Sequence, residues 1–262
     1  MKKLSLLSVA LATIGSIGSS NAADLPARMA TPAPTAYVNW TGFYAGVNAG
    51  YGWGDPKSHL LTGPLARFTA DPLAPADYNT ATNGFIGGAQ AGYNYQINTV
   101  VVGIETDIQF SNINGTMTTP STFLPALASP ATFTESETLS WLGTARGRIG
   151  FLPMSNLMLY GTGGLAYGRI NATSLFHFDT APFVAYSGSV AQTKTGWTLG
   201  GGAEWALDRS WSVKAEYLYY DLGTINVTGL PPVLGPIPFA TQLSQKATGS
   251  IARFGLNFMI GN

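Results

Sequence analysis

Eight segments of this chain alternate large apolar residues with small or polar ones, and this alternation limits the possible fold more than any other feature. In the first segment, 42–53, Phe43, Val47 and Trp53 share one parity, while Asn48 has the other. Successive side chains of a β-strand point to opposite faces, so each such segment is predicted to be a strand with one apolar face. The seven further segments are 84–95, 100–110, 138–151, 157–168, 195–207, 211–221 and 248–260.

The parity also assigns individual residues to a face. In the segment 138–151 it places Leu139 and Trp141 on the apolar face. The segment 157–168 is less regular, because Met158 and Tyr160 fall on the face that is otherwise small or polar.

The connections between the segments alternate in length. Those after the second, fourth and sixth segments are short, at 96–99, 152–156 and 208–210, whereas the others span about 25 residues each. Barrels that cross a bacterial outer membrane show the same alternation, with tight periplasmic turns and long outer loops. The sequence therefore predicts an all-β fold, an eight-stranded antiparallel up-and-down transmembrane β-barrel, with both mature termini in the periplasm.

The composition agrees with a membrane barrel. Only 10% of the residues are charged, against about 25% in soluble domains. Beyond the first 22 residues no apolar run is long enough for a spanning helix, and a closed barrel is the other backbone arrangement that lipid permits. The 13 basic and 13 acidic residues leave no basic footprint for nucleic acid. The lack of cysteine excludes disulfides, thiolate metal sites and thiol catalysis.

The N-terminus predicts export. A basic start, the apolar run 4–17 and the small residues before Ala23 predict a signal peptide over 1–22, cleaved after Ala22. The alternative is an N-terminal membrane anchor. Residues 23–40 contain three prolines and are predicted to form an extended periplasmic leader, followed by an outer-membrane barrel domain over 41–262.

The tryptophans are predicted to lie at the ends of strands. Indole rings prefer the headgroup level of a bilayer, so we expect two interfacial aromatic belts. The alternative is that they are ordinary core anchors. The belt at the long-loop rim contains Trp53, Trp141 and Trp197, and the belt at the short-turn rim contains Trp40, Trp205 and Trp211.

Charged residues within the strands all fall on the face that would point into the barrel. An eight-stranded barrel is just wide enough for side chains to fill it, so we expect a satisfied polar core. A narrow ion or proton path lined by the same residues is the alternative. The four acids and four bases of this predicted network are Glu105, Asp107, Arg146, Arg148, Glu204, Lys214, Glu216 and Arg253.

No motif predicts catalysis or a cofactor. The two histidines, His59 and His177, fall in the first and third long connections, and His177 could equally belong to a strand extended above the membrane. The nearby Ser58 and Asp55 do not establish the geometry of a nucleophile, base and acid. The sequence 200–202, Gly-Gly-Gly, lies inside a strand and does not form a phosphate-binding loop. We therefore expect no catalytic residue, cofactor or metal, with an outer-membrane hydrolase as a remote alternative.

Four motifs carry a resemblance to a known family. They are Ala-Asp-Leu-Pro-Ala-Arg at 23–28, Trp-Thr-Gly-Phe-Tyr-Ala-Gly at 40–46, Gly-Gly-Leu-Ala-Tyr-Gly at 163–168 and Lys-Ala-Glu-Tyr-Leu-Tyr-Tyr-Asp-Leu at 214–222. Together they resemble the alphaproteobacterial outer-membrane immunogenic or porin-like proteins, which carry an OmpA-type barrel domain. The resemblance covers essentially the whole mature chain and implies an abundant barrel exposed at the cell surface. Such chains usually end on an aromatic residue, whereas this one ends on Asn262, so recognition by the assembly machinery through Phe258 is an assumption.

These observations predict a non-enzymatic integral outer-membrane protein that supports envelope integrity and interacts with its surroundings through surface loops. The alternative is a narrow porin-like channel for ions or small solutes. The expected partners are outer-membrane lipid and lipopolysaccharide, the barrel-assembly machinery and external ligands of the long loops, but no nucleic acid. The apolar, proline-rich loop at 230–239 is expected to pack as a lid or against other loops, or else to form an adhesive patch.

Overall fold

The computed structural model describes residues 38–61, 77–118, 122–124, 129–178, 184–229 and 241–260. The predicted signal peptide, the leader up to residue 37 and the proline-rich run 230–239 lie outside these residues. In the described part of the chain, no helix is long and apolar enough to cross a membrane. The strands are β1 (Gly42–Gly54), β2 (Lys57–Leu61), β3 (Asp77–Asn79), β4 (Thr82–Ile97), β5 (Val100–Thr118), β6 (Thr122–Leu124), β7 (Ser129–Met154), β8 (Leu157–Phe178), β9 (Val184–Ala206), β10 (Trp211–Gly229) and β11 (Thr241–Ile260).

Eight long strands close into a ring. The order β1-β4-β5-β7-β8-β9-β10-β11 follows the chain, and β11 pairs back onto β1 from Phe43↔Ile260 to Trp53↔Ser250. Every pairing in the ring is antiparallel. The prediction of an eight-stranded up-and-down barrel is confirmed, and each predicted segment belongs to a different strand of the ring, with at most one residue outside it.

The outer face of the ring is apolar, as a surface in contact with lipid must be. Phe110, Phe254 and Phe85 are 78%, 74% and 70% exposed, and outward-facing aliphatic side chains surround them. Adjacent strands pair their aromatic rings across this face, as in the edge-to-face contact of Tyr51 with Phe85 at 5.2 Å.

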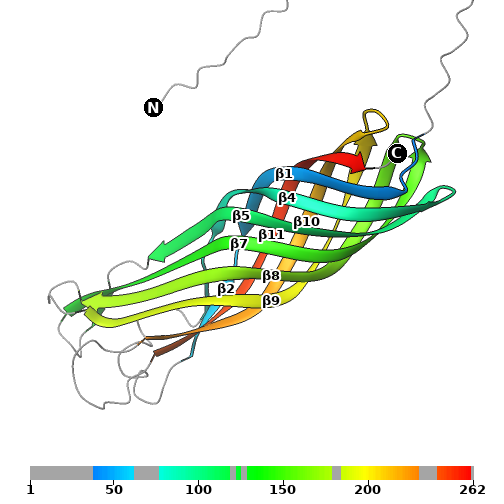
Figure 1. The fold of residues 1–262 in the computed structure, drawn as a ribbon. Helices are drawn as coiled ribbons and strands as arrows, with labels where there is room; N and C mark the ends of the chain where they lie inside the picture. The colour runs from blue at the N-terminus through cyan, green and yellow to red at the C-terminus, as the bar shows by residue number, and fades with distance from the viewer. Residues whose placement is uncertain are drawn as a thin grey trace, which may run out of the picture. The chain divides into compact units, whose positions relative to one another are not determined.

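At the end of the barrel where the long loops were predicted, the strands extend further than the predicted segments. The predicted short turns are present, for example at Asn98 and Thr99, between β4 and β5. Of the predicted long loops, much is strand: β7 begins at Ser129, and β8 and β9 are separated by residues 179–183 only. Figure 1 shows β7, β8 and β9 continuing well past the ends of β1 and β4. The described parts of the predicted long connections are thus largely strand, which the periodicity did not predict.

Above the outer tryptophans the ring divides into two sheets. Pairing between β9 and β10 ends at Trp197↔Asp221, whereas β8 stays paired with β9 up to His177↔Val184. On the other side β10 and β11 remain paired to Gly229↔Thr241, and β2 and β3 extend that sheet. One sheet is thus β5-β7-β8-β9 and the other β10-β11-β2-β3. We call this part of the molecule the outer extension.

Two irregularities mark the base of the outer extension. On β7 the register shifts between Leu139 and Trp141, which reverses the parity of all residues before the shift. Leu139 is therefore buried, and its predicted position on the apolar outer face was wrong. On β10 the register shifts between Asp221 and Thr224, where Gly223 adopts a φ of 80° and its amide donates to Asp221 Oδ1.

The interior contains two apolar clusters at opposite ends of the ring. One cluster begins inside the outer end of the ring and continues into the outer extension, where it joins both sheets. It consists of Ile86, Ile113, Phe133, Leu139, Leu142, Ala166, Ile170, Ala172, Leu218, Tyr220, Leu222, Ile225, Val227, Leu243, Ala247 and Ile251. The cluster at the short-turn end consists of Val38, Trp40, Tyr44, Val101, Leu152, Met158, Tyr160, Ala206 and Met259. Charged and amide side chains fill the space between the two clusters.

Candidate functional site: the barrel interior

The structure brings all eight predicted interior charges into one buried network. Each is at most 5% exposed. They come from strands β5, β7, β9, β10 and β11, so the network extends across the barrel from wall to wall.

Arg146 lies at the centre of this network. Its Nη2 donates to Glu105 Oε1 at 2.5 Å and to Asp107 Oδ2 at 2.9 Å. Its Nη1 donates to Glu216 Oε1 at 3.0 Å. One guanidinium thus contacts three carboxylates from two strands, β5 and β10, which lie apart in the ring. Removing it would leave three buried acids with less compensation.

Arg253 and Lys214 provide further positive charge next to the same carboxylates. Arg253 donates to Asp107 Oδ2 at 2.8 Å and to Glu216 Oε2 from Nε at 2.7 Å. Lys214 Nζ lies 2.7 Å from Glu105 Oε2. Because the network holds four acids and four bases, all in contact, its net formal charge is zero.

Arg148 and Glu204 form the side of the network nearest the short turns. Arg148 Nη2 donates to Glu204 Oε2 at 2.6 Å, and Glu204 Oε1 accepts from Ser212 Oγ at 2.6 Å. The Arg148 guanidinium stands 5.6 Å from the Tyr44 ring centroid and 4.3 Å from that of Tyr160, both within the range of a cation–π contact.

Neutral side chains that were not predicted to belong to the charge network complete the site. The Tyr44 hydroxyl donates to Glu105 at 2.7 Å, and the Tyr160 hydroxyl donates to Glu216 at 3.0 Å. A chain of amides continues from Asn48 through Gln90 to Asn257. Their inward parity was the available signal, since an aromatic hydroxyl on the small and polar face of a barrel strand needs a partner.

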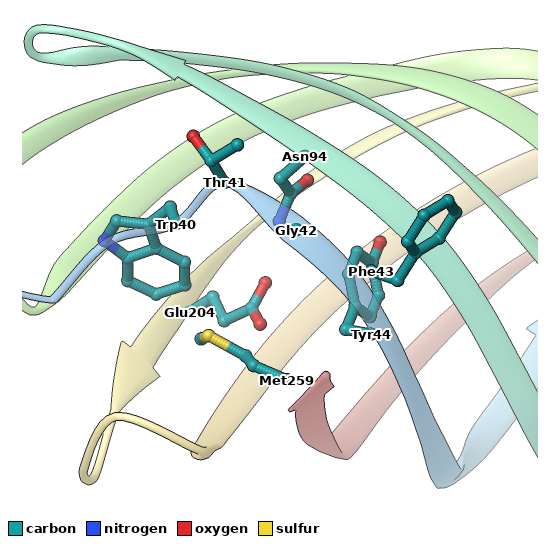
Figure 2. Close-up of a pocket in the computed structure, with 8 residues that line it drawn as sticks. All are labelled: Trp40, Thr41, Gly42, Phe43, Tyr44, Asn94, Glu204 and Met259. Atoms are coloured by element: carbon teal, nitrogen blue, oxygen red, sulfur yellow. The ribbon is translucent and has the colours of Figure 1, made fainter. Parts of the chain in front are cut away.

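A tryptophan closes the short-turn end of the interior. Trp40 is 1% exposed, its Nε1 donates to Ser155 O at 3.1 Å, and its backbone N donates to Gln96 Oε1 at 2.9 Å. Figure 2 shows its ring beside Glu204 and Met259 while Phe43 points away from them. The recess that these residues line has no room for a water molecule. The prediction that Trp40 belongs to the interfacial belt was wrong, because the chain before β1 turns across the barrel end and carries the ring inside.

The other five tryptophans face outward from the strands. Four of them, Trp53, Trp197, Trp205 and Trp211, are 40–49% exposed. Trp141 is half-buried against Tyr167, with ring centroids 5.9 Å apart. Trp197 packs against Tyr219 in a tilted arrangement at the long-loop rim, and Trp211 packs on Phe258 at the short-turn rim.

The two histidines lie on strands of the outer extension. His59 is on β2, where its exposed side chain alternates with the buried Ser58. Neighbouring strand residues point to opposite faces, so these two side chains diverge. His177 is on β8, as its interpretation as a strand extension required, and pairs with Thr132 of β7. Within the described ranges no group of three or more histidine or acidic side chains could hold a metal ion.

A second polar cluster, which the sequence did not predict, lies in the outer extension. Glu135 and Glu137 are both buried there, although they were expected in a loop. They lie two residues apart on the stretch of β7 whose parity the shift at Leu139 reverses, so both point inward. Burial, and the nearby Glu135 carboxylate, raise the pKa of Glu137 to about 7.

The architecture defines the class of protein. A closed antiparallel ring with an apolar outer face, aromatic rings at both rims and a charged interior is an integral outer-membrane β-barrel. The family model described as outer membrane protein beta-barrel domain matches residues 10–258. The chain belongs to this family.

Individual proteins are similar over most of the chain. The 31 kDa outer-membrane immunogenic protein of Brucella melitensis biotype 1 is 34% identical over 261 residues, which cover 98% of this chain and 99% of that protein. The 22 kDa outer membrane protein of Rhizobium leguminosarum bv. viciae is 28% identical over 183 residues, covering 70% and 64% of the two chains. Among solved structures, the outer membrane protein OprG of Pseudomonas aeruginosa superposes with a TM-score of 0.52 at 13% identity, covering 87% of this chain and all of that one. The resemblance to the alphaproteobacterial immunogenic proteins is confirmed, and it places the chain in the outer membrane.

Proposed function

We propose that this protein is a closed, non-enzymatic barrel that contributes to the integrity of the outer membrane and presents its outer extension at the cell surface. The observation that carries this proposal is that the interior is filled at three successive levels. These are the Trp40 cluster at the short-turn end, the neutral charge network and the apolar cluster of the outer extension.

Conductance tests whether the barrel is closed. Refolded protein in a planar lipid bilayer is expected to show no discrete openings. As a matched control we propose the double variant Glu105→Ala/Arg148→Ala, which removes one acid and one base and so empties part of the network without changing its net charge. This variant is expected to show openings while it retains the heat-modifiable gel mobility of a folded barrel. Discrete openings of the unaltered protein would overturn the proposal in favour of a narrow channel for ions or small solutes.

The proposal includes an orientation. We place the short turns and both mature termini in the periplasm, after export and cleavage behind Ala22, and the outer extension outside the cell. The immunogenic label of the Brucella relatives supports exposure at the surface, and so does the length of the strands on that side. The partners we propose are outer-membrane lipid and lipopolysaccharide, the barrel-assembly machinery and external ligands of the outer extension.

Epitope insertion tests this orientation. One tag is placed in the 179–183 connection between β8 and β9, and a second is placed after Asp208 in the turn between β9 and β10. Antibody is expected to label the first tag on intact cells and the second only after permeabilisation. The reverse pattern would invert the orientation.

A further inference from the structure

A groove crosses the lipid-facing surface of four neighbouring strands, β11, β1, β4 and β5. Its volume is about 860 Å³, within the range of about 300–1,000 Å³ for small-molecule sites. Ala49 of β1 pairs with Phe254 of β11 and with Gly87 of β4. Gly87 in turn pairs with Phe110 of β5. The two small residues therefore form the floor of the groove and the two phenyl rings its walls. We call it the lipid groove.

The lipid groove lies in the half of the ring next to the outer extension. Ala49 precedes Trp53 of the long-loop rim by four residues on β1, which corresponds to a depth of about 10 Å for a tilted strand. The apolar band of a membrane barrel is about 25 Å tall, so the floor lies in the half of the band nearest this rim. The end of the groove nearest the rim is lined by Tyr51 and Phe85, whose rings meet edge to face. Its occupant must therefore come from the leaflet that borders the outer extension.

Amide side chains lie where the lipid groove reaches the rim. Asn83 of β4 pairs with Trp53 on one side and with Asn114 on the other, so these residues form one row across three strands. The Tyr51 hydroxyl donates to Asn83 Oδ1 at 2.8 Å, and a backbone amide of β4 donates to Asn112 Oδ1 at 2.6 Å. Asn83 and Asn112 are both exposed. Because their oxygens already accept hydrogen bonds, their NH₂ groups are the donors that remain for a ligand.

This combination matches an acyl chain that is attached to a polar headgroup through a carbonyl. Within a bilayer all apolar contacts replace similar ones, so van der Waals packing and hydrogen bonds decide which molecule stays bound. A chain seated between Phe110 and Phe254 packs against both walls and the floor. The carbonyl at its head then lies at the level of the rim, where Asn83 and Asn112 can donate to it.

We propose that the lipid groove binds one acyl chain of lipopolysaccharide, and that the carbonyl linking this chain to its sugar accepts hydrogen bonds from Asn83 and Asn112. Lipopolysaccharide forms the outer leaflet of the outer membrane, and its chains are joined to glucosamine by amide and ester bonds. This inference rests on the orientation given in the proposed function, which places the outer extension outside the cell.

The opposite half of the ring provides a comparison. A smaller groove of about 450 Å³ lies there on the lipid-facing side, beside Val100, Phe151 and Leu159. The residues that line it include no amide side chain. It offers apolar contacts to a phospholipid chain but no matching donors for a linking carbonyl. The two leaflets thus meet different surfaces on this barrel.

Native mass spectrometry tests the lipid groove. Refolded full-length protein in neutral detergent is titrated with hexa-acylated lipid A, the membrane-embedded part of lipopolysaccharide, and separately with dipalmitoyl phosphatidylethanolamine. We expect one lipid A to be retained per chain, and to bind about tenfold more tightly than the phospholipid, because amide carbonyls and sugar hydroxyls add hydrogen bonds. The measurement uses no membrane and no conductance, so its outcome is independent of the epitope and bilayer experiments on the proposed function.

Variants locate the binding. Ala49→Leu fills the floor of the groove and should weaken lipid A binding by about tenfold or more, because the displaced chain loses its packing contacts. Ala45→Leu is the matched control, since it makes the same change at an exposed position on the lipid face of β1 outside the groove. Asn83→Ala should weaken binding about three- to tenfold through the lost donor, whereas Asn226→Ala, an exposed amide on β10, should leave it unchanged.

Heat-modifiable gel mobility establishes that each variant is folded. Equal affinity for the two lipids, or a preference for phosphatidylethanolamine, would overturn the proposal. Equal losses of lipid A binding in Ala49→Leu and Ala45→Leu would overturn it as well, because the lipid would then not occupy this groove.

Discussion

The membrane ring and the outer extension are built from the same strands, yet they are organised in opposite ways. In the ring the large apolar side chains face outward and the charges lie inside. In the outer extension the interior is mostly apolar, apart from the polar cluster around Glu135 and Glu137, and the outward-facing residues are mostly hydroxyl and amide side chains. Examples are Thr134, Ser136, Thr138, Thr173, Ser187, Ser189, Thr224, Asn226 and Thr228.

The difference follows from the solvent on the outer face. Lipid excludes polar groups from the outside of the ring, so the charges of the chain must be satisfied within it. Beyond the tryptophan rim the outer face meets water, and the interior can be an ordinary hydrophobic core. On β7 and β10 the change from a polar to an apolar interior coincides with the register shifts next to Leu139 and Gly223. Substitutions confined to one region at a time test this contrast.

Removing Arg146 should damage the ring most. Arg146→Ala leaves Glu105, Asp107 and Glu216 without their shared partner, and loss of one member of a buried ion pair costs about 3–5 kcal/mol. The midpoint of the heat-induced gel shift should fall strongly. Arg169→Ala, an exposed arginine on β8, should leave the midpoint almost unchanged. Equal midpoints for the two variants would show that the network does not support the barrel.

Truncating a core residue of the outer extension should act only there. Ile225 is fully buried on β10, and Ile225→Ala is expected to cost about 2–4 kcal/mol. Hydrogen exchange should accelerate in 222–229 and 241–247, while the midpoint of the gel shift of the ring stays unchanged. The exposed neighbour Thr224→Ala serves as the control. A fall in the gel-shift midpoint as large as that of Arg146→Ala would mean that the two regions unfold together.

Acidification should stabilise the outer extension. The pKa of Glu137 is raised to about 7 in the folded protein and is close to 4.3 in an unfolded chain. The folded form therefore binds its proton more tightly, and stability is highest below the unfolded pKa and is lost as the pH rises through 7. The change in the free energy of unfolding between pH 5 and pH 8 should be at most about 3 kcal/mol. This pH dependence is measured as the protease resistance of the outer extension in the unaltered protein and in Glu137→Gln. An identical pH dependence in the two proteins would argue against titration of Glu137.

Changes in the aromatic belt should have the smallest effect. Trp197 packs on Tyr219 with ring centroids 5.4 Å apart, and such a pair contributes about 1 kcal/mol beyond the area it buries. Trp197→Ala should therefore lower the gel-shift midpoint slightly, and much less than Arg146→Ala does. A loss as large as that of Arg146→Ala would mean that Trp197 acts as a core anchor.

The alternation with a period of two was sufficient to predict the ring, because every side chain of a strand that faces lipid must be apolar. The same rule placed Glu105, Arg146 and Arg253 inside. This rule could not predict the outer extension, where the few charged residues are not confined to one face: Glu135 and Glu137 are buried, whereas Lys246 is exposed. The inward turn of Glu135 and Glu137 depends on a single extra residue at Ser140, a change that no local pattern announces. Trp40 was assigned to the aromatic belt in error, because it precedes β1. Its position depends on how the chain turns across the end of the barrel and not on the parity of a strand.

The separation of β9 from β10 beyond Trp197 and Asp221 has a consequence for sequence variation within the family. In a closed ring the stagger of all strands must sum to a fixed shear, so an insertion in one strand has to be matched around the whole circumference. A hairpin whose outer edge pairs with no other strand of the described residues is free of that condition. The β8–β9 hairpin can lengthen or shorten at its outer end, beyond the Ala131↔Phe178 pair with β7, without changing any pairing in the ring. The surface of such a barrel can therefore change in length and sequence between related bacteria while the part that seals the membrane stays constant.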